Sequence, residues 1–204
     1  MKKQHKETSS MQAEAAGRGF ARGWGAAGIA GGLCLTASGI MQAVQPPGCI
    51  AEECIGRTYR SAGPFEALLF LAGIVLIIVA TLGFLTAQPA APRAVRIAAV
   101  AAAAGMFFGF ALMGSVLYFA GLALVVVAIA AYVVLGISAA SSRVLPVWAG
   151  VLLAASALLL LGANDQNERI LFVVPFALTW IVLGALLWTS APRSQGRTGN
   201  VQVA

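Results

Sequence analysis

The sequence predicts an all-α fold, a polytopic transmembrane bundle of six helices with both termini in the cytoplasm. Two features of the composition point to it. Of the 204 residues, 60% are hydrophobic and only 10% are charged, whereas a soluble globular domain carries about 25% charged residues. The mean hydropathy is +0.89, so a chain of this length cannot cover its apolar surface without a bilayer.

The third feature is the grouping of apolar residues into six runs long enough to span a membrane, which takes about 18 residues or more. The predicted spans are residues 24–44, 64–87, 97–114, 116–138, 144–163 and 170–189. A polar basic tail, 1–23, precedes them, and a second cytoplasmic tail, 190–204, follows. Residues 45–63 form the outer loop. This length leaves no room for a second, soluble domain.

The first run, residues 24–44, is the least hydrophobic because it is rich in glycine and other small residues. Basic residues precede it, and Met-Gln-Ala at positions 41–43 resembles a small-residue cleavage site. A cleavable signal peptide is therefore the alternative to a first span. Cleavage there would leave five spans with the same placement of the C-terminus.

Local signals divide the later runs. The third and fourth runs nearly touch, which predicts a tight turn at Gly114 and Ser115, because one helix across both would be about twice as long as a bilayer is thick. Pro146 opens the fifth run and suits a first helical turn. Pro175 lies a third of the way along the last run and predicts a kink.

Charge sets the orientation, because basic residues of polytopic proteins collect on the cytoplasmic side. With the N-terminus inside, the inner segments hold ten basic and two acidic residues, and the outer segments hold three basic and five acidic residues. Trp24, Trp148 and Trp188 fall at the predicted inner boundary, where the indole ring favours the headgroup region. This distribution accounts for the net charge of +6 without nucleic acid as a partner.

The predicted spans hold no ionisable residue at mid-membrane. Ion-coupled transporters and voltage sensors depend on such residues. A haem or zinc site needs several converging ligands, and the one histidine, His5, lies in the tail. We therefore expect no catalytic residue, no cofactor and no metal. In the segment 164–168, Asp165 or Asn167 is expected to cap the last helix, because the spacing does not match a calcium loop.

Small residues recur every four positions on two spans and predict close helix packing. They are Gly28, Gly32 and Thr36 in the first span and Ala101, Gly105 and Gly109 in the third. We expect these two faces in the interior of the bundle or against each other. Hydroxyl groups within the spans should bond to their own helix or to a neighbour; they belong to Thr36, Ser38, Thr81, Ser156 and Thr179.

The outer loop has the most varied chemistry, in the stretch PPGCIAEECIGRTYR from residue 46 to residue 60. Cys49 and Cys54 face the oxidising side in the predicted orientation, which favours a disulfide across a turn. Redox chemistry is the alternative, although thiol oxidoreductases favour Cys-x-x-Cys and four residues separate this pair. The charged and aromatic residues of the loop predict a contact surface; they are Glu52, Glu53, Arg57, Tyr59 and Arg60.

For function, the sequence favours a non-catalytic component of a bacterial inner or plasma membrane that acts through helix packing and the outer-loop contact. Its partners would be the lipid bilayer and either a membrane protein or a second copy of the chain. The first alternative is a facilitator for a small neutral or lipophilic solute, with a gap lined by small residues of the packing faces, Gly28, Gly32, Thr36, Gly105 and Gly109. The second is a thiol redox protein that uses Cys49 and Cys54.

Overall fold

A computed structural model describes residues 2–46, 48, 60, 62–86, 91–141 and 146–189, with side chains from residue 22 onward. Within these ranges the chain is helical and contains no strand, which confirms the all-α class. The helices are α1 (Lys2–Ala43), α2 (Pro64–Thr86), α3 (Arg93–Met113), α4 (Tyr118–Ser141), α5 (Val147–Leu159), η1 (Leu160–Gly162), η2 (Glu168–Phe172) and α6 (Val173–Thr189).

Five of the described helical stretches are long and apolar enough to cross a membrane, as an integral membrane protein requires. They are Arg22–Ala43, Pro64–Thr86, Arg93–Met113, Tyr118–Ser141 and Glu168–Thr189. The fifth predicted span, 144–163, is shorter in the structure. The apolar helix there is Val147–Gly162, and its last three residues tighten into a 3₁₀ turn. The structure therefore supports five full-length spans and one shorter apolar helix.

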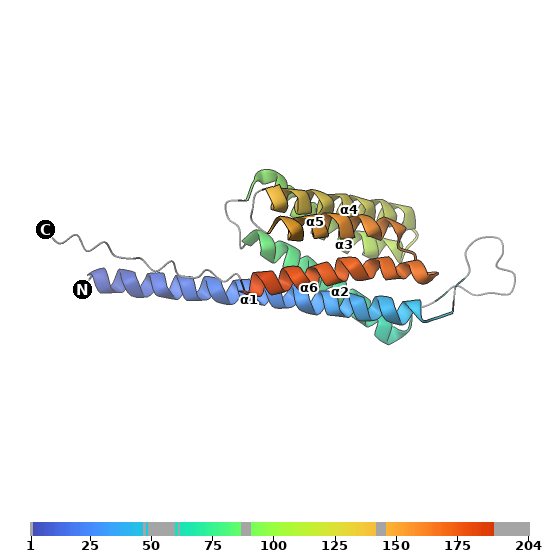
Figure 1. Cartoon of the computed structure of the whole chain (residues 1–204), viewed down its shortest axis with the longest axis horizontal. Coiled ribbons are helices and arrows are strands. Elements are labelled where there is room, and N and C mark those ends of the chain that lie inside the picture. Colours follow the sequence, from blue (N-terminus) through green and yellow to red (C-terminus); the bar gives the residue numbers. More distant parts are fainter. Residues whose placement is uncertain are drawn as a thin grey trace.

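The ends of the elements agree with most of the local signals. Helix α1 begins at Lys2, so the residues predicted as a polar tail continue the first span as a helix that extends beyond the others (Figure 1). The predicted turn at Gly114 and Ser115 is confirmed, with the Ser115 backbone N–H donating to the Leu112 carbonyl at 3.0 Å. Pro146 directly precedes α5.

The position of Pro175 within its helix differs from the expected one. The change from 3₁₀ to α-helix comes at Val173, and Pro175 falls in the first turn of α6. In the first turn of a helix the missing N–H of proline has no intrahelical acceptor to lose. The sequence predicts a position a third of the way along the span, because hydropathy does not distinguish the preceding 3₁₀ turn from the α-helix.

The six α-helices form two layers of three (Figure 1). In the first layer α1 packs between α2 and α6, and in the second α4 packs between α3 and α5. The contacts within each layer are more extensive than those that join the layers, which run from α2 to α3 and from α5 to α6. We call the two groups the α1 layer and the α4 layer.

Within each layer the helices approach closely because glycines face each other across the contacts. The facing pairs are Gly25 with Gly184, Gly31 with Gly73, Gly109 with Gly121 and Gly136 with Gly150. A Cβ added at Gly184 would lie 2.5 Å from the carbonyl oxygen of Gly25, a separation that real Cβ atoms essentially never show. Backbone therefore packs directly on backbone inside a layer.

Between the layers the contact is made by larger side chains, and we call it the seam. Phe70 of α2 meets Phe110 of α3 edge to face, with ring centroids 5.0 Å apart. Tyr132 of α4 packs in the same way on Phe176 of α6, at 5.1 Å. A hydrogen bond also crosses the seam, between the hydroxyls of Thr81 and Tyr132, at 3.1 Å.

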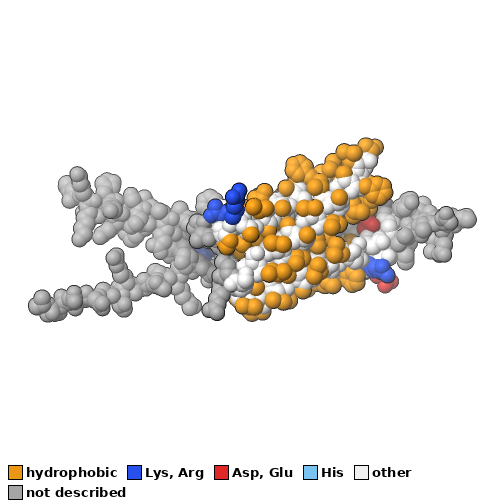
Figure 2. All heavy atoms as spheres, turned by 90° about the horizontal axis from the view of Figure 1, so that it is seen from above, with side chains coloured by type: hydrophobic (Ala, Val, Ile, Leu, Met, Phe, Trp, Pro, Cys, Tyr) orange, Lys and Arg blue, Asp and Glu red, His pale blue; other side chains and the backbone are white. Residues whose placement is uncertain are grey.

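Hydrophobic side chains cover the visible face of the bundle, and charged side chains gather at its two ends (Figure 2). At one end, which we call the Arg93 end, the charged side chains that the structure describes are basic: Arg22, Arg93 and Arg96. At the other, the Arg60 end, they are Arg60, Glu66, Asp165, Glu168 and Arg169. The segregation follows the predicted pattern, in which the Arg93 end is the cytoplasmic one; that orientation stays a prediction.

Candidate functional site

Arg60 is the member of the predicted outer-loop contact that the structure describes; Glu52, Glu53, Arg57 and Tyr59 lie outside the described residues. Its guanidinium donates to four backbone carbonyl oxygens. Two belong to the end of α1, with Nε bonded to Pro46 at 3.0 Å and Nη2 bonded to Gln45. Two belong to the α5–α6 connection, with Nη1 3.3 Å from the oxygens of Asp165 and Asn167.

The backbone of Arg60 joins the same connection. Its N–H donates to Oε1 of Gln166 at 2.8 Å, and Nε2 of Gln166 donates to the Arg60 carbonyl at 3.4 Å. The N–H of Gly48 donates to the Gln166 carbonyl at 2.8 Å. We call these contacts the Arg60 cluster. Because arginine carries five N–H donors in a rigid fork, one side chain satisfies the carbonyls of Gln45 and Pro46, which follow α1, and two carbonyls of the α5–α6 connection.

The α5–α6 connection folds by local amide contacts. Oδ1 of Asn167 accepts from the Arg169 backbone N–H at 2.9 Å, and Asn167 precedes η2. The predicted cap is therefore confirmed at Asn167. Oδ1 of Asn164 accepts from the Gln166 N–H at 2.9 Å. In the part of the chain that the structure describes, no group of three or more His, Cys, Asp or Glu residues could hold a metal ion.

Glu66 is buried beneath this end of the bundle, with 2% of its surface exposed. Its Oε2 accepts from the N–H of Gly63 at 3.2 Å and from Nε2 of Gln45 at 2.6 Å. The Ser38 hydroxyl donates to the Glu66 carbonyl at 3.3 Å. A glutamate in the third helical position that reaches back to the N–H before the helix is half of a capping box. Glu66 thus starts α2 and ties it to α1.

Sequence reasoning counted Glu66 among the outer charges and missed its burial. The signal available was its position three residues after Gly63, where a carboxylate can cap α2. The burial itself depends on α1, where Ser38, Gln42 and Gln45 recur at the spacing of one helix face. Oε1 of Glu66 and Oε1 of Gln42 are both buried and have no hydrogen-bond partner among the described residues.

The predicted packing faces of α1 and α3 do not contact each other. Each of them packs against a different helix. Gly28 and Gly32 face α6; a Cβ at Gly28 would lie 3.3 Å from the carbonyl oxygen of Trp180. Gly105 and Gly109 face α4; a Cβ at Gly105 would lie 2.7 Å from the carbonyl oxygen of Leu124. Ala101 is half-buried against the core. The proposed common gap is therefore wrong, because these glycines pack against neighbouring helices in separate layers.

The hydroxyls within the spans act largely as predicted. Thr81 and Thr179 donate to carbonyls one turn earlier, Ile77 and Pro175, at 2.8 and 2.9 Å. Ser156 donates to the Leu153 carbonyl at 3.3 Å. Thr36 is the exception, since its hydroxyl is buried and has no partner among the described residues.

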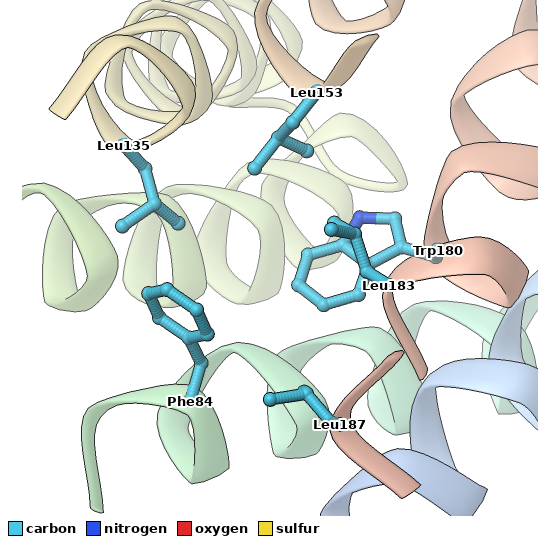
Figure 3. A pocket seen from close by; sticks show the side chains of 6 residues that line it. All are labelled: Phe84, Leu135, Leu153, Trp180, Leu183 and Leu187. Carbon is cyan, nitrogen blue, oxygen red and sulfur yellow. The ribbon is translucent and has the colours of Figure 1, made fainter. Parts of the chain in front are cut away.

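A small apolar cavity lies at the seam, nearer the Arg93 end. Figure 3 shows the six lining side chains directed toward one space, from both layers: Phe84, Trp180, Leu183 and Leu187 from the α1 layer, and Leu135 and Leu153 from the α4 layer. Its volume of about 10 Å³ is close to the minimum for one water molecule. In this conformation the seam therefore holds no open passage at the cavity.

Cys49 and Cys54 lie outside the described residues, so the disulfide and the redox alternative both stay predictions. Cys34 is a free, half-buried thiol in α1. Comparison with known proteins found no matching family, no similar curated protein and no similar solved structure.

Proposed function

We propose that the protein is a non-catalytic component of a cell membrane that presents a contact surface at the Arg60 end to a membrane protein or to a second copy of the chain. The Arg60 cluster is the observation that carries this proposal. One arginine joins the end of α1, the segment before α2 and the α5–α6 connection. A surface ordered before binding loses less entropy on binding, which favours specific recognition.

The interior supports the same proposal. The polar groups buried at mid-helix are neutral hydroxyls and an indole, on Thr36, Thr81, Tyr132, Ser156, Thr179 and Trp180. In the described chain most of these hydroxyls are bonded to carbonyls or to each other. The bond between Thr81 and Tyr132 joins two helices, and the others are made within one helix. Among the described residues, the hydrogen bonds of these hydroxyls are to carbonyls and to another hydroxyl, not to an acidic or basic side chain that could activate them.

A photo-cross-linking residue placed at Glu52 or Tyr59 of the full chain, in living cells, tests the contact. The control carries the same residue at Phe119, which is 82% exposed on α4 at the same end. We expect an adduct of one defined mass from the loop positions and none of that mass from Phe119. The same adduct should be lost when Arg60→Ala is added. Identical adducts from the loop and from Phe119 would contradict the proposal.

A second candidate function is facilitated passage of a small neutral or lipophilic solute, and the cavity at the seam favours it. The lining side chains are apolar apart from the Trp180 indole, and they come from both layers. Liposomes containing the protein should swell faster than empty liposomes in glycerol or urea, and Leu187→Phe should slow the swelling by filling the cavity. Equal swelling rates with and without protein would contradict this candidate.

A further inference from the structure

The two layers repeat one helix contact. In the α1 layer, a Cβ added at Gly25 would lie 2.7 Å from the carbonyl oxygen of Gly184. In the α4 layer, a Cβ added at Gly121 would lie 2.6 Å from the carbonyl oxygen of Gly109. The reverse contacts are also present. A Cβ added at Gly184 would lie 2.5 Å from the carbonyl oxygen of Gly25, and a Cβ added at Gly109 would lie 3.1 Å from the carbonyl oxygen of Gly121. The α1–α6 contact therefore matches the α4–α3 contact.

The neighbouring residues extend the match. In each contact the first glycine also meets the backbone nitrogen four residues beyond its partner glycine, at Trp188 and at Met113, 2.9 and 2.6 Å from the added Cβ. The partner glycine meets in turn a β-branched residue four positions beyond the first glycine. That residue is Ile29 in α1 and Val125 in α4. The same register recurs where Gly136 of α4 meets Gly150 of α5, so it is characteristic of close antiparallel glycine contacts. What relates the two contacts is the order of their neighbours, because α1 lies between α2 and α6 as α4 lies between α5 and α3.

The correspondence defines two repeated units. Positions of α1 map onto α4 with a constant shift, as Gly25 and Ile29 map onto Gly121 and Val125, and α3 maps onto α6 in the same way. Helix α2 flanks α1 as α5 flanks α4. The units are therefore α1–α3 and α4–α6. Because each unit has three helices, α1 and α4 run in opposite directions through the bundle (Figure 1), which makes the repeat an inverted one.

The two units share the α1–α6 and α4–α3 contacts. They differ where α1 meets α2 and α4 meets α5, because Gly31 and Gly136 are not equivalent positions, and they differ at the seam. Ala102 of α3 and its equivalent Ala177 of α6 are both 0% exposed. Leu183 of α6 is 3% exposed and lines the cavity, whereas its equivalent on α3, Phe108, is 55% exposed. If the two units of an inverted repeat can pack against each other in two ways, equivalent residues occupy different environments in each of the two conformations. The difference between Leu183 and Phe108 is an asymmetry of this kind.

We propose that the two layers are rigid bodies that move against each other at the seam. The cavity near the Arg93 end then alternates with a cavity near the Arg60 end, lined by the equivalent residues Phe108 and Leu112. Glycine contacts hold each layer rigid because backbone meets backbone, while the seam consists of longer side chains that can slide. The solute is a small neutral molecule, because the lining holds no charged group, and for that solute the inference rests on the second candidate function.

Spin-label distances measured on the full chain in lipid nanodiscs test the motion. The native cysteines are first replaced, as Cys34→Ala, Cys49→Ser and Cys54→Ser. One labelled pair spans the seam at the Arg93 end, Ser141 with Thr189, and another spans it at the Arg60 end, Ser115 with Glu168. The control pair, Thr86 with Thr189, lies within the α1 layer. We expect two distance populations in both cross-seam pairs and one population in the control pair.

Removing the hydrogen bond across the seam should change the ratio of the two distance populations. Tyr132→Phe removes its bond with Thr81 and should change the population ratio about threefold, the equivalent of one interhelical hydrogen bond in a membrane, in opposite senses at the two ends. Thr179→Val, which loses only a bond within α6, should leave the ratio unchanged. A single narrow distribution in both cross-seam pairs, in wild type and Tyr132→Phe alike, would overturn the proposal. Two populations without solute flux would support the motion and contradict the second candidate function.

Discussion

Thr36 and Thr81 both place a hydroxyl inside the bundle, but their surroundings differ. The Thr81 hydroxyl bonds to the Ile77 carbonyl and to Tyr132, whereas the Thr36 hydroxyl is buried and has no partner in the described part of the chain. A buried hydroxyl without a partner costs free energy, because it has lost its bonds to water or to another polar group. Valine has nearly the shape of threonine and lacks the hydroxyl. A threonine-to-valine substitution therefore isolates the contribution of the hydroxyl to the free energy of unfolding.

We therefore expect Thr36→Val to raise the free energy of unfolding by about 1 kcal/mol and Thr81→Val to lower it by about 0.6 kcal/mol. Unfolding of both variants in bicelles, by titration with a denaturing detergent, measures the two changes. Equal effects of the two substitutions would show that the hydroxyls share one environment and would contradict the structure at these positions.

The hydrogen bonds of the Arg60 side chain can also be tested by substitution. Arg60→Ala should lower the free energy of unfolding by about 2 kcal/mol, because it removes charge-assisted bonds to four carbonyls. Arg60→Lys keeps the charge but cannot reach all four oxygens with one ammonium group, so it should recover only part of the loss. Arg22→Ala, at an exposed position on α1, is the control. Full recovery by lysine would mean that charge alone, and not the fork geometry, stabilises this end.

The close contacts between helices depend on glycine, and a matched pair of variants can test this. Gly184→Ala should lower the free energy of unfolding by about 1–3 kcal/mol, because the new Cβ would overlap the Gly25 backbone and force the helices apart. Gly23→Ala is the control: nothing lies within 4 Å of its added Cβ, and alanine favours a helix by about 0.5–1 kcal/mol over glycine. Thermal unfolding in the same bicelles compares them, and a neutral Gly184→Ala would contradict the contact.

The positions of the elements were largely predictable, because a run of apolar residues is a local property of the sequence. Five stretches matched in type and place, and the turn at Gly114 and Ser115 followed from the thickness of a bilayer. The shortening of α5 was not predictable, because hydropathy stays high through the 3₁₀ turn at its end. Hydropathy measures how apolar a stretch is and does not measure its length as an α-helix.

The partners of the elements were not predictable from spacing. The Gly28–Gly32 pattern marks a face of α1 that can be approached closely, but it does not identify the neighbour. The neighbour, α6, supplies Gly184 as a single glycine without a spaced motif of its own. Glu66 was missed for a related reason: its burial depends on the face that α1 turns toward the start of α2. Contacts between distant segments decide both features.

At the scale of the whole molecule, the main feature is the inverted repeat that we infer, in which equivalent helices cross the bundle in opposite directions. Arg22 of α1 and Tyr118 of α4 are equivalent positions, three residues before Gly25 and Gly121. They should therefore lie at opposite faces of the membrane, with the Arg22 side cytoplasmic according to the charge distribution.

Side-specific labelling tests this claim most directly. Arg22→Cys and Tyr118→Cys are introduced singly into the chain without native cysteines, and a membrane-impermeant maleimide is applied to intact cells and to inside-out vesicles. In the inverted arrangement, Arg22→Cys is labelled only in inside-out vesicles and Tyr118→Cys only in intact cells. Labelling of both cysteines from the same side of the membrane would contradict the inverted arrangement.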